Sequence, residues 1–350
     1  MSEKAPLVKE VLTTLLEGTD VSRATAKQAL GAILDGQVTP AQIGALLVAW
    51  RLKGETVEEI TGFVEAMRGA CVPFCASRSP LVDLCGTGGD GSGTINISTA
   101  ASLIVAAALS ESNAGGVAKH GNRSASSQCG SADVLEALGI AVEVPPDRGA
   151  ACLDEHGFAF LFAPSYHPAM RYAGPPRREL GIRTFFNILG PLSSPAGVKR
   201  QLIGVFDDAV RSTMAQVLRE LGSEHVWVVH SVLGDGRGLD ELSIAGESRV
   251  TCLKGGAIEE FEVTPEDAGL ERSSLDALRG GDASHNAERV AAILQGEKGP
   301  QRDAVLLNAG AALVIADAVA DIREGVQRGS EVIDSGRARS FLEELKAWTV

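Results

Sequence analysis

From residue 83 the chain reads Asp83-Leu-Cys-Gly86-Thr-Gly-Gly-Asp90-Gly-Ser-Gly-Thr94-Ile-Asn96-Ile-Ser98-Thr99, and this stretch decides the expected fold. A short apolar run ends where five glycines fall within positions 86–93, and an apolar helical run follows at 100–109. A strand that passes through a glycine-rich turn into a helix is typical of βα units in a parallel sheet. Glycines allow close backbone approach, and a helix start offers free N–H groups, so the stretch predicts a phosphate-binding loop. A purely structural tight turn is the alternative. The order of residues matches neither a P-loop nor a dinucleotide-binding fingerprint.

The same strand-then-helix pattern continues along the chain on the C-terminal side of this loop. Strands are expected at residues 81–85, 116–119, 142–144, 158–162, 202–206, 226–230, 249–254 and 258–263, and late helices at 284–296, 302–320 and 337–347. Residues before about 70 are instead purely helical, and capping signals at Thr39-Pro40 and from Thr56 to Glu59 open two of the four helices. Residues 163–195 are also helical in pattern and are broken by prolines.

These patterns predict an α/β protein with a small all-helical domain and a larger α/β domain, whose central sheet is mainly parallel and flanked by helices. The length of 350 residues agrees with roughly two domains at about 150 residues each. We expect the helical domain to comprise residues 1–75 and about 166–195. The α/β domain then comprises residues 76–165 and about 196–350.

Composition narrows the class of protein. Lys and Arg number 32 against 45 Asp and Glu, a net charge of -13, which disfavours binding to a nucleic-acid backbone. The six cysteines form no disulfide framework, and Cys71 and Cys75 have no partners for a zinc site. The N-terminus is unlike a signal peptide, and the longest apolar runs, 99–109 and 305–316, are too short to cross a bilayer. We therefore expect a cytoplasmic protein that binds neither membrane nor nucleic acid.

A second polar segment runs from Lys119 to Ser127, directly after an expected strand, and a capped helix begins near Ser131. Its cations, imidazole, amide and hydroxyls should lie at the carboxyl ends of the strands, where α/β folds bind ligands. A solvated loop is the alternative.

A third segment is the acidic pair Asp240-Glu241, which follows the strand expected at 226–230 and a turn containing Gly234, Gly236 and Gly238. Adjacent carboxylates near phosphate oxygens suit Mg²⁺. Such a pair alone is usually just solvated, so its proximity to the other segments is what favours a metal site.

A fourth segment contains Arg177, Arg178 and Arg183 beside two phenylalanines. The planar guanidinium is the usual partner of a substrate carboxylate, although structural ion pairs account for at least one of the three arginines.

The four segments, in this order and with these residues, resemble those of the anthranilate phosphoribosyltransferase family. The resemblance extends over essentially the whole chain. The resemblance implies transfer of the 5-phosphoribosyl group from phosphoribosyl pyrophosphate to the amine of anthranilate, with release of pyrophosphate, in tryptophan biosynthesis. It also implies an active site between the two domains and a homodimer formed through the helical domains. The links at 109–116 and 231–238 look longer than the family's, and Ser193-Ser194 stands where the family more often has Thr-Asn.

The resemblance also implies roles for individual residues. The phosphoribosyl pyrophosphate site would comprise Gly86, Gly89, Asp90, Thr94, Asn96, Ile97, Ser98, Thr99, Lys119, His120, Gly121, Asn122, Arg123, Ser124, Ala125, Ser126, Ser127 and Ser131. Mg²⁺, two ions per site, would be bound by Ser98, Asp240 and Glu241. Anthranilate would contact Gly86, Asn122 and Arg177. No residue is assigned as a general base, and His120 is the one candidate.

Two other functions fit the same fold. A nucleoside phosphorylase would also use a glycine-rich phosphate loop, but it would not be expected to carry the segment from Lys119 to Ser127 or the Asp240-Glu241 pair. A non-catalytic relative that binds nucleic acid is disfavoured by the net charge of -13.

Overall fold

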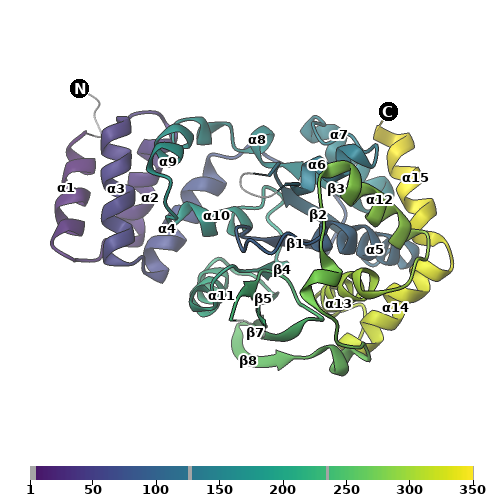
Figure 1. Cartoon of the computed structure of the whole chain (residues 1–350). Coiled ribbons are helices and arrows are strands. Elements are labelled where there is room, and N and C mark those ends of the chain that lie inside the picture. Colours follow the sequence, from purple (N-terminus) through teal and green to yellow (C-terminus); the bar gives the residue numbers. More distant parts are fainter. Residues whose placement is uncertain (1–4, 125–127, 234–235, 350) are drawn as a thin grey trace.

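The computed structural model describes residues 5–124, 128–233 and 236–349 (Figure 1). The chain begins with the helices α1 (Ala5–Leu16), α2 (Arg23–Leu34), α3 (Pro40–Lys53) and α4 (Val57–Gly69). The two capping signals in the sequence act as expected. The Thr39 hydroxyl accepts from the Gln42 N–H, the Thr56 hydroxyl accepts from the Glu59 N–H, and both partner side chains accept in return from the capping residue's N–H. These four helices lie together at one end of the molecule (Figure 1).

A single mixed sheet forms the centre of the rest of the chain. Its strands are β1 (Leu81–Gly86), β2 (Gly116–Gly121), β3 (Phe158–Phe162), β4 (Arg200–Gly204), β5 (His225–Leu233), β6 (Gly238–Leu239), β7 (Gly246–Lys254) and β8 (Ala257–Val263). The strand order is β3-β2-β1-β4-β5-β7-β8, and β6 pairs with β5. From β3 to β5 all neighbours are parallel, whereas β6 and β7 pair antiparallel with β5, and β8 pairs antiparallel with β7. The carboxyl ends of β1 to β5 therefore meet at one edge.

Helices cover both faces of this sheet. They are α5 (Ile97–Ser112), α6 (Ser131–Ala137), α7 (Pro146–His156), α11 (Arg211–Glu220), α12 (Ala283–Leu294), α13 (Pro300–Ile315), α14 (Ile322–Asp334) and α15 (Arg337–Thr349). Short 3-10 turns occupy Pro168–Arg171, Asp208–Val210, Pro265–Ala268 and Leu275–Leu278. Leu84 and Leu202 pack into the core formed by α5 and α13 on one face. Ile203 and Val228 point to the other face, whose core is continuous with that of the helical bundle.

The stretch between β3 and β4 contains α8 (Ala163–Tyr166), α9 (Gly174–Leu180) and α10 (Phe186–Leu192) and no strand. Its aromatic side chains pack on the N-terminal helices: the Phe185 ring stacks on Phe63 with centroids 4.1 Å apart and lies edge-on to Trp50 at 5.6 Å. Figure 1 shows α9 and α10 beside α3 and α4.

Three expectations about individual elements are wrong. Residues 142–144 form no strand, because Pro145 and Pro146 follow at once and cannot donate to a ladder. The helix expected at 302–320 ends at Ile315, where Asp317 takes a positive φ of 56°, and the separate helix α14 went unpredicted. The link at 231–238 is partly strand, since β5 continues through Leu233. In the described ranges, no helix has the length and apolar character needed to traverse a bilayer.

Candidate active site

The Asp240-Glu241 pair lies against the ends of β1 and β4. A Cβ atom placed on Gly86 would be 2.8 Å from Asp240 Oδ2, and one on Gly204 would collide with the Asp240 carbonyl oxygen. The strand β4 therefore needs glycine at position 204, where the clash is with backbone, whereas a side chain at position 86 would force the Asp240 carboxylate to shift.

The acidic pair binds the glycine-rich loop directly. The Gly88 N–H donates to Asp240 Oδ2 at 2.7 Å, and the Ser98 N–H donates to Glu241 Oε1 at 3.1 Å. Asp90 Oδ2 in turn accepts from the Asp240 N–H at 3.3 Å. Residues about 150 positions apart thus meet at one sheet edge, where the expected order of strands and loops would place them.

Three carboxylates gather here, and the described residues place fewer cations than carboxylates beside them. Burial raises the pKa of Glu241 to about 7, although the buried Lys119 ammonium opposes this shift. Burial also raises the pKa of Asp240 well above its usual value, and the charges of Asp90 and Glu241 add to the effect. A divalent cation would relieve this repulsion.

The donor set fits Mg²⁺. Oxygen ligands from Asp240, Glu241 and the Ser98 hydroxyl are the kind that Mg²⁺ prefers. Within the described ranges no group of three or more His, Cys, Asp and Glu side chains is placed to hold a metal ion. Mg²⁺ ordinarily takes one or two carboxylates and completes its shell with substrate phosphate and water, so an open arrangement is the expected one.

The rest of the glycine-rich loop is ordered by its own polar groups and by distant residues. Asp90 Oδ1 accepts from the N–H and the hydroxyl of Ser92, both at 3.0 Å. Arg183 donates to the Gly89 carbonyl oxygen, and its guanidinium lies 3.9 Å from the Phe206 ring centroid. Ile97 and Thr99 are only 1% exposed, and the Ile97 N–H already donates to the Ile95 carbonyl oxygen at 2.8 Å, so of these two residues Thr99 would reach a ligand through its backbone N–H.

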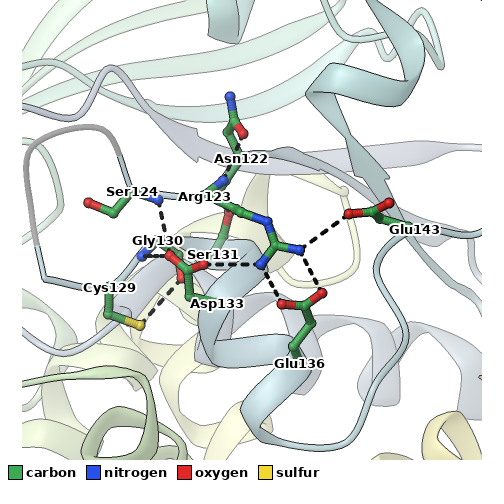
Figure 2. Close-up of polar contacts among 9 residues, drawn as sticks. All are labelled: Asn122, Arg123, Ser124, Cys129, Gly130, Ser131, Asp133, Glu136 and Glu143. Carbon is green, nitrogen blue, oxygen red and sulfur yellow. Dashed lines mark hydrogen bonds and ion pairs between the residues drawn. The ribbon is translucent and has the colours of Figure 1, made fainter.

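The loop after β2 is closed by Asp133 on α6 (Figure 2). One Asp133 oxygen accepts from the N–H groups of Ser124 at 3.0 Å and Gly130 at 2.8 Å, which draws the two ends of the loop together. The expected ligands Ala125, Ser126 and Ser127 lie outside the described residues. The Ser131 hydroxyl donates to the Asn122 carbonyl oxygen at 3.2 Å.

Arg123 is an expected ligand of the phosphates of phosphoribosyl pyrophosphate, but in this structure its side chain binds other residues. Its guanidinium pairs with Glu136, Asp133 and Glu143, as Figure 2 shows. The structure therefore turns this side chain toward α6, and a contact with phosphate would require it to leave three carboxylates.

Lys119 and His120 lie on β2 and are both buried. Lys119 Nζ donates to the Leu84 carbonyl oxygen, and His120 Nδ1 lies 3.2 Å from the Gly190 carbonyl oxygen. Burial lowers the pKa of His120 to about 3, so its ring is neutral near pH 7. With Nδ1–H donating to Gly190, Nε2 carries a lone pair, and this atom has no hydrogen-bond partner in the described parts of the chain.

Arg177 on α9 is half-buried, with its guanidinium 4.7 Å from the Phe186 ring centroid. Burial lowers its pKa, and across residues 5–124, 128–233 and 236–349 no group hydrogen-bonds or ion-pairs with its guanidinium. A half-buried cation of this kind is suited to an anionic ligand.

Several residues at the site were not singled out from the sequence. His167 lies with its ring centroid 5.2 Å from that of His120, and its position soon after β3 was an available signal. Arg183 was noted only as one of three arginines. The Asn308 side chain on α13 accepts from the Leu242 N–H at 3.1 Å and donates to the Leu242 carbonyl oxygen at 2.8 Å. No local sequence pattern predicts this contact.

Two family models match the chain. A glycosyl transferase family helical bundle domain covers residues 9–71, and a glycosyl transferase family a/b domain covers residues 78–339. These two matches correspond to the N-terminal helices and to the sheet with its flanking helices.

Individual relatives are similar over their full length. Anthranilate phosphoribosyltransferase from Moorella thermoacetica is 51% identical over 342 residues, with 98% of each chain covered. The crystal structure of the Thermus thermophilus enzyme superposes with a TM-score of 0.89 at 44% identity, covering 97% of this chain and 99% of that one. The Saccharomyces cerevisiae enzyme in complex with PRPP and Mg gives 0.88 at 25% identity, covering 99% and 98%. The chain therefore belongs to the anthranilate phosphoribosyltransferase family.

Proposed function

We propose that the sheet edge around Gly86, Asp240 and Glu241 is where this chain exercises the family's activity. That activity transfers the 5-phosphoribosyl group from phosphoribosyl pyrophosphate to the amine of anthranilate in tryptophan biosynthesis. The observation that carries the proposal is the pairing of Asp240 and Glu241 with the N–H groups of Gly88 and Ser98. It joins a metal-binding dipeptide to a phosphate-binding loop at one place.

The donor, phosphoribosyl pyrophosphate, binds to two loops. The glycine-rich loop contributes Gly86, Gly89, Asp90, Thr94, Asn96 and the first turn of α5, from Ile97 to Thr99. The loop after β2 contributes residues 119–127 and Ser131, and Arg123 leaves Asp133, Glu136 and Glu143 to do so. Backbone N–H groups and the α5 N-terminus bind the phosphates without requiring a net positive charge, which suits a chain of charge -13.

The acceptor, anthranilate, binds on the side of the helical domain. Arg177 pairs with its carboxylate, and the absence of any other partner for this guanidinium in the described residues supports that role. Asn122 and Gly86 complete the acceptor site, between the carboxylate and the donor.

Two Mg²⁺ ions bind through Ser98, Asp240 and Glu241 together with the donor pyrophosphate. When bound, Mg²⁺ neutralises the negative charge that develops on the leaving pyrophosphate. The structure of the Saccharomyces cerevisiae relative is in complex with PRPP and Mg, which supports Mg²⁺ as the metal.

In the reaction the bond from ribose C1 to the pyrophosphate oxygen breaks, and the anthranilate nitrogen forms a new bond to C1. Positioning by the two loops and by Arg177 brings nitrogen and C1 together. The amine loses a proton after attack. No residue is assigned as the acceptor of this proton; His120, whose Nε2 has no hydrogen-bond partner in the described residues, is the one candidate.

The chain divides into a helical domain of residues 1–75 and about 166–195 and an α/β domain of residues 76–165 and about 196–350. The stacking of Phe185 on Phe63 supports the return of the chain to the helical domain. Leu16 and Leu52, 73% and 81% exposed on α1 and α3, support a homodimer formed through this domain. The enzyme acts in the cytoplasm and binds neither nucleic acid nor membrane.

The direct test is to mix the protein with Mg²⁺, phosphoribosyl pyrophosphate and anthranilate and to follow the loss of anthranilate fluorescence. Pyrophosphate should appear in equal amount. Fluorescence that stays constant while phosphate and a nucleoside are converted would assign the chain to nucleoside phosphorolysis instead. Light scattering at micromolar concentration tests the homodimer, and a monomer there would contradict it.

A further inference from the structure

A buried asparagine on a distant helix is joined to the glycine-rich loop. Asn286 on α12 is 1% exposed and lies 190 residues away from Asn96 in the sequence. The segment just before α12 pairs with the loop's backbone: Gly280 N–H donates to the Gly93 carbonyl at 2.8 Å, and Ile95 N–H donates to the Leu278 carbonyl at 3.0 Å. The start of α12 is thereby fastened to the loop that precedes α5.

Three hydrogen bonds run in one direction through this region. The Gly281 N–H donates to Asn286 Oδ1 at 2.8 Å, and Asn286 Nδ2 donates to Asn96 Oδ1 at 2.8 Å. Asn96 Nδ2 then donates to the Cys129 carbonyl oxygen at 3.2 Å. The series starts at a backbone N–H and ends at a backbone C=O, neither of which can reverse its polarity. Only one orientation of both amide groups therefore satisfies all of the bonds.

Because of these three hydrogen bonds, the Asn96 side chain does not cap the helix α5. Asn96 occupies the N-cap position of α5, where asparagine ordinarily accepts a hydrogen bond from an N–H in the first turn of the helix. Here its side chain makes no capping bond, and the Ser98 N–H donates to Glu241 Oε1 instead. The N-terminus of α5 is consequently left to negatively charged groups that come from elsewhere.

We propose that Asn286 is a positioning residue for phosphoribosyl pyrophosphate. It acts through Asn96, in two ways. It keeps the amide oxygen of Asn96 away from the N-terminus of α5, and it directs the amide nitrogen to Cys129, which fixes the glycine-rich loop relative to the loop after β2. The inference rests on the proposed function, because it takes these two loops as the donor site.

The test compares Asn286→Asp and Asn286→Ala with Val290→Ala. Aspartate has nearly the shape of asparagine but cannot donate to Asn96 Oδ1, so it breaks the series at one bond. Val290 is a fully buried core residue on the same helix, and its truncation controls for a general loss of stability. For each protein we would measure the KM of both substrates, the donor Kd by calorimetry, and the Tm.

Asn286→Asp should raise the KM and Kd for phosphoribosyl pyrophosphate about 10-fold, while the KM for anthranilate stays within about twofold. Val290→Ala should lower the Tm and leave both KM values within about twofold. Because Asn286 acts through Asn96, adding Asn286→Asp to an Asn96→Ala protein should change the donor Kd by less than about twofold.

An Asn286→Asp protein with unchanged donor KM and Kd would overturn the inference, as would equal effects of Asn286→Ala and Val290→Ala on the donor KM. Full additivity with Asn96→Ala would also overturn it, since the two residues would then act separately. If Asn286→Asp fails to fold, the donor Kd is compared for Asn286→Ala, Asn96→Ala and the protein that carries both substitutions, and the same outcomes apply. An unmodified protein that forms no phosphoribosylanthranilate would refute the proposed function instead.

Discussion

The two donor loops differ in where their structural support comes from. The glycine-rich loop is held by Asp240 and Asn286, whose partners lie 152 and 190 residues away in the sequence. The loop after β2 is held by Asp133 and Glu136, only 3 to 13 residues from their partners. One loop can therefore form its contacts locally, whereas the other acquires its shape only when distant elements of the α/β domain come together. The variants below separate these two kinds of support.

The largest expected effect comes from removing the distant acidic partners of the glycine-rich loop. Asp240→Asn combined with Glu241→Gln should lower turnover by about 10²- to 10³-fold, roughly 3 to 4 kcal/mol of barrier, because charge on the leaving pyrophosphate loses its stabilisation. The Mg²⁺ concentration needed for the remaining activity should rise. Near-normal turnover with an unchanged Mg²⁺ titration would show that the pair is only a solvated turn.

A substitution outside both loops should weaken the binding of the acceptor, anthranilate, and leave the binding of the donor unchanged. Arg177→Ala should weaken anthranilate binding by about 2 kcal/mol, roughly 30-fold, since the carboxylate loses a half-buried cationic partner. The donor KM should stay near normal, and Arg177→Lys should restore part of the loss. Steady-state kinetics with each substrate varied in turn checks this, and equal losses for both substrates would assign Arg177 a structural role.

Breaking the local support should produce a measurable loss of stability as well as of donor affinity. Asp133→Ala removes the acceptor of the Ser124 and Gly130 N–H groups and should lower the free energy of unfolding by about 1 to 3 kcal/mol. The donor KM should rise several-fold. Chemical denaturation and kinetics test both effects. Glu143→Gln is the control, because Glu143 contacts the Arg123 guanidinium at 3.3 Å and, in the described structure, makes no contact with the Ser124 or Gly130 N–H groups.

The raised pKa of Glu241, about 7, predicts the direction of a pH effect on stability. Because the folded protein holds this proton up to a higher pH than the unfolded chain does, the free energy of unfolding should fall as pH rises from about 5 through 7. Glu241→Gln should reduce this dependence, leaving the part due to Asp240, and should stabilise the Mg²⁺-free protein at pH 8 by about 1 kcal/mol, since partial solvent access reduces the burial penalty. Denaturation curves at pH 5.5 and 8 would contradict this if the variant and the parent protein lose stability equally.

The smallest effect is expected for the contact between Arg183 and the glycine-rich loop. Arg183→Met removes the exposed donor to the Gly89 carbonyl and the cation–π contact with the partly buried Phe206, which follows β4. The donor KM should rise about threefold with the free energy of unfolding unchanged within about 0.5 kcal/mol. A change in stability without any change in KM would make Arg183 a purely structural contact.

Much of the fold follows from local chemistry that the sequence displays. The capping pairs at Thr39 and Thr56 place two helix starts, because a capping box forms between residues three positions apart. The apolar runs before glycines locate the strands β1 to β5, since parallel strands are buried on both faces. The same logic fails at residues 142–144, where apolar composition suggested a strand and two following prolines prevent one.

The sequence also determined that Asp240 and Glu241 would approach the glycine-rich loop, because strand ends in a parallel sheet share one edge. Only the tertiary structure decided which groups hold that loop. The amides of Asn96 and Asn286 and the guanidinium of Arg183 each bind a partner that no periodicity, cap or spacing connects to them. A hydrogen bond across 190 residues depends on how α12 packs beside α5, and that packing is set by the whole core rather than by either segment.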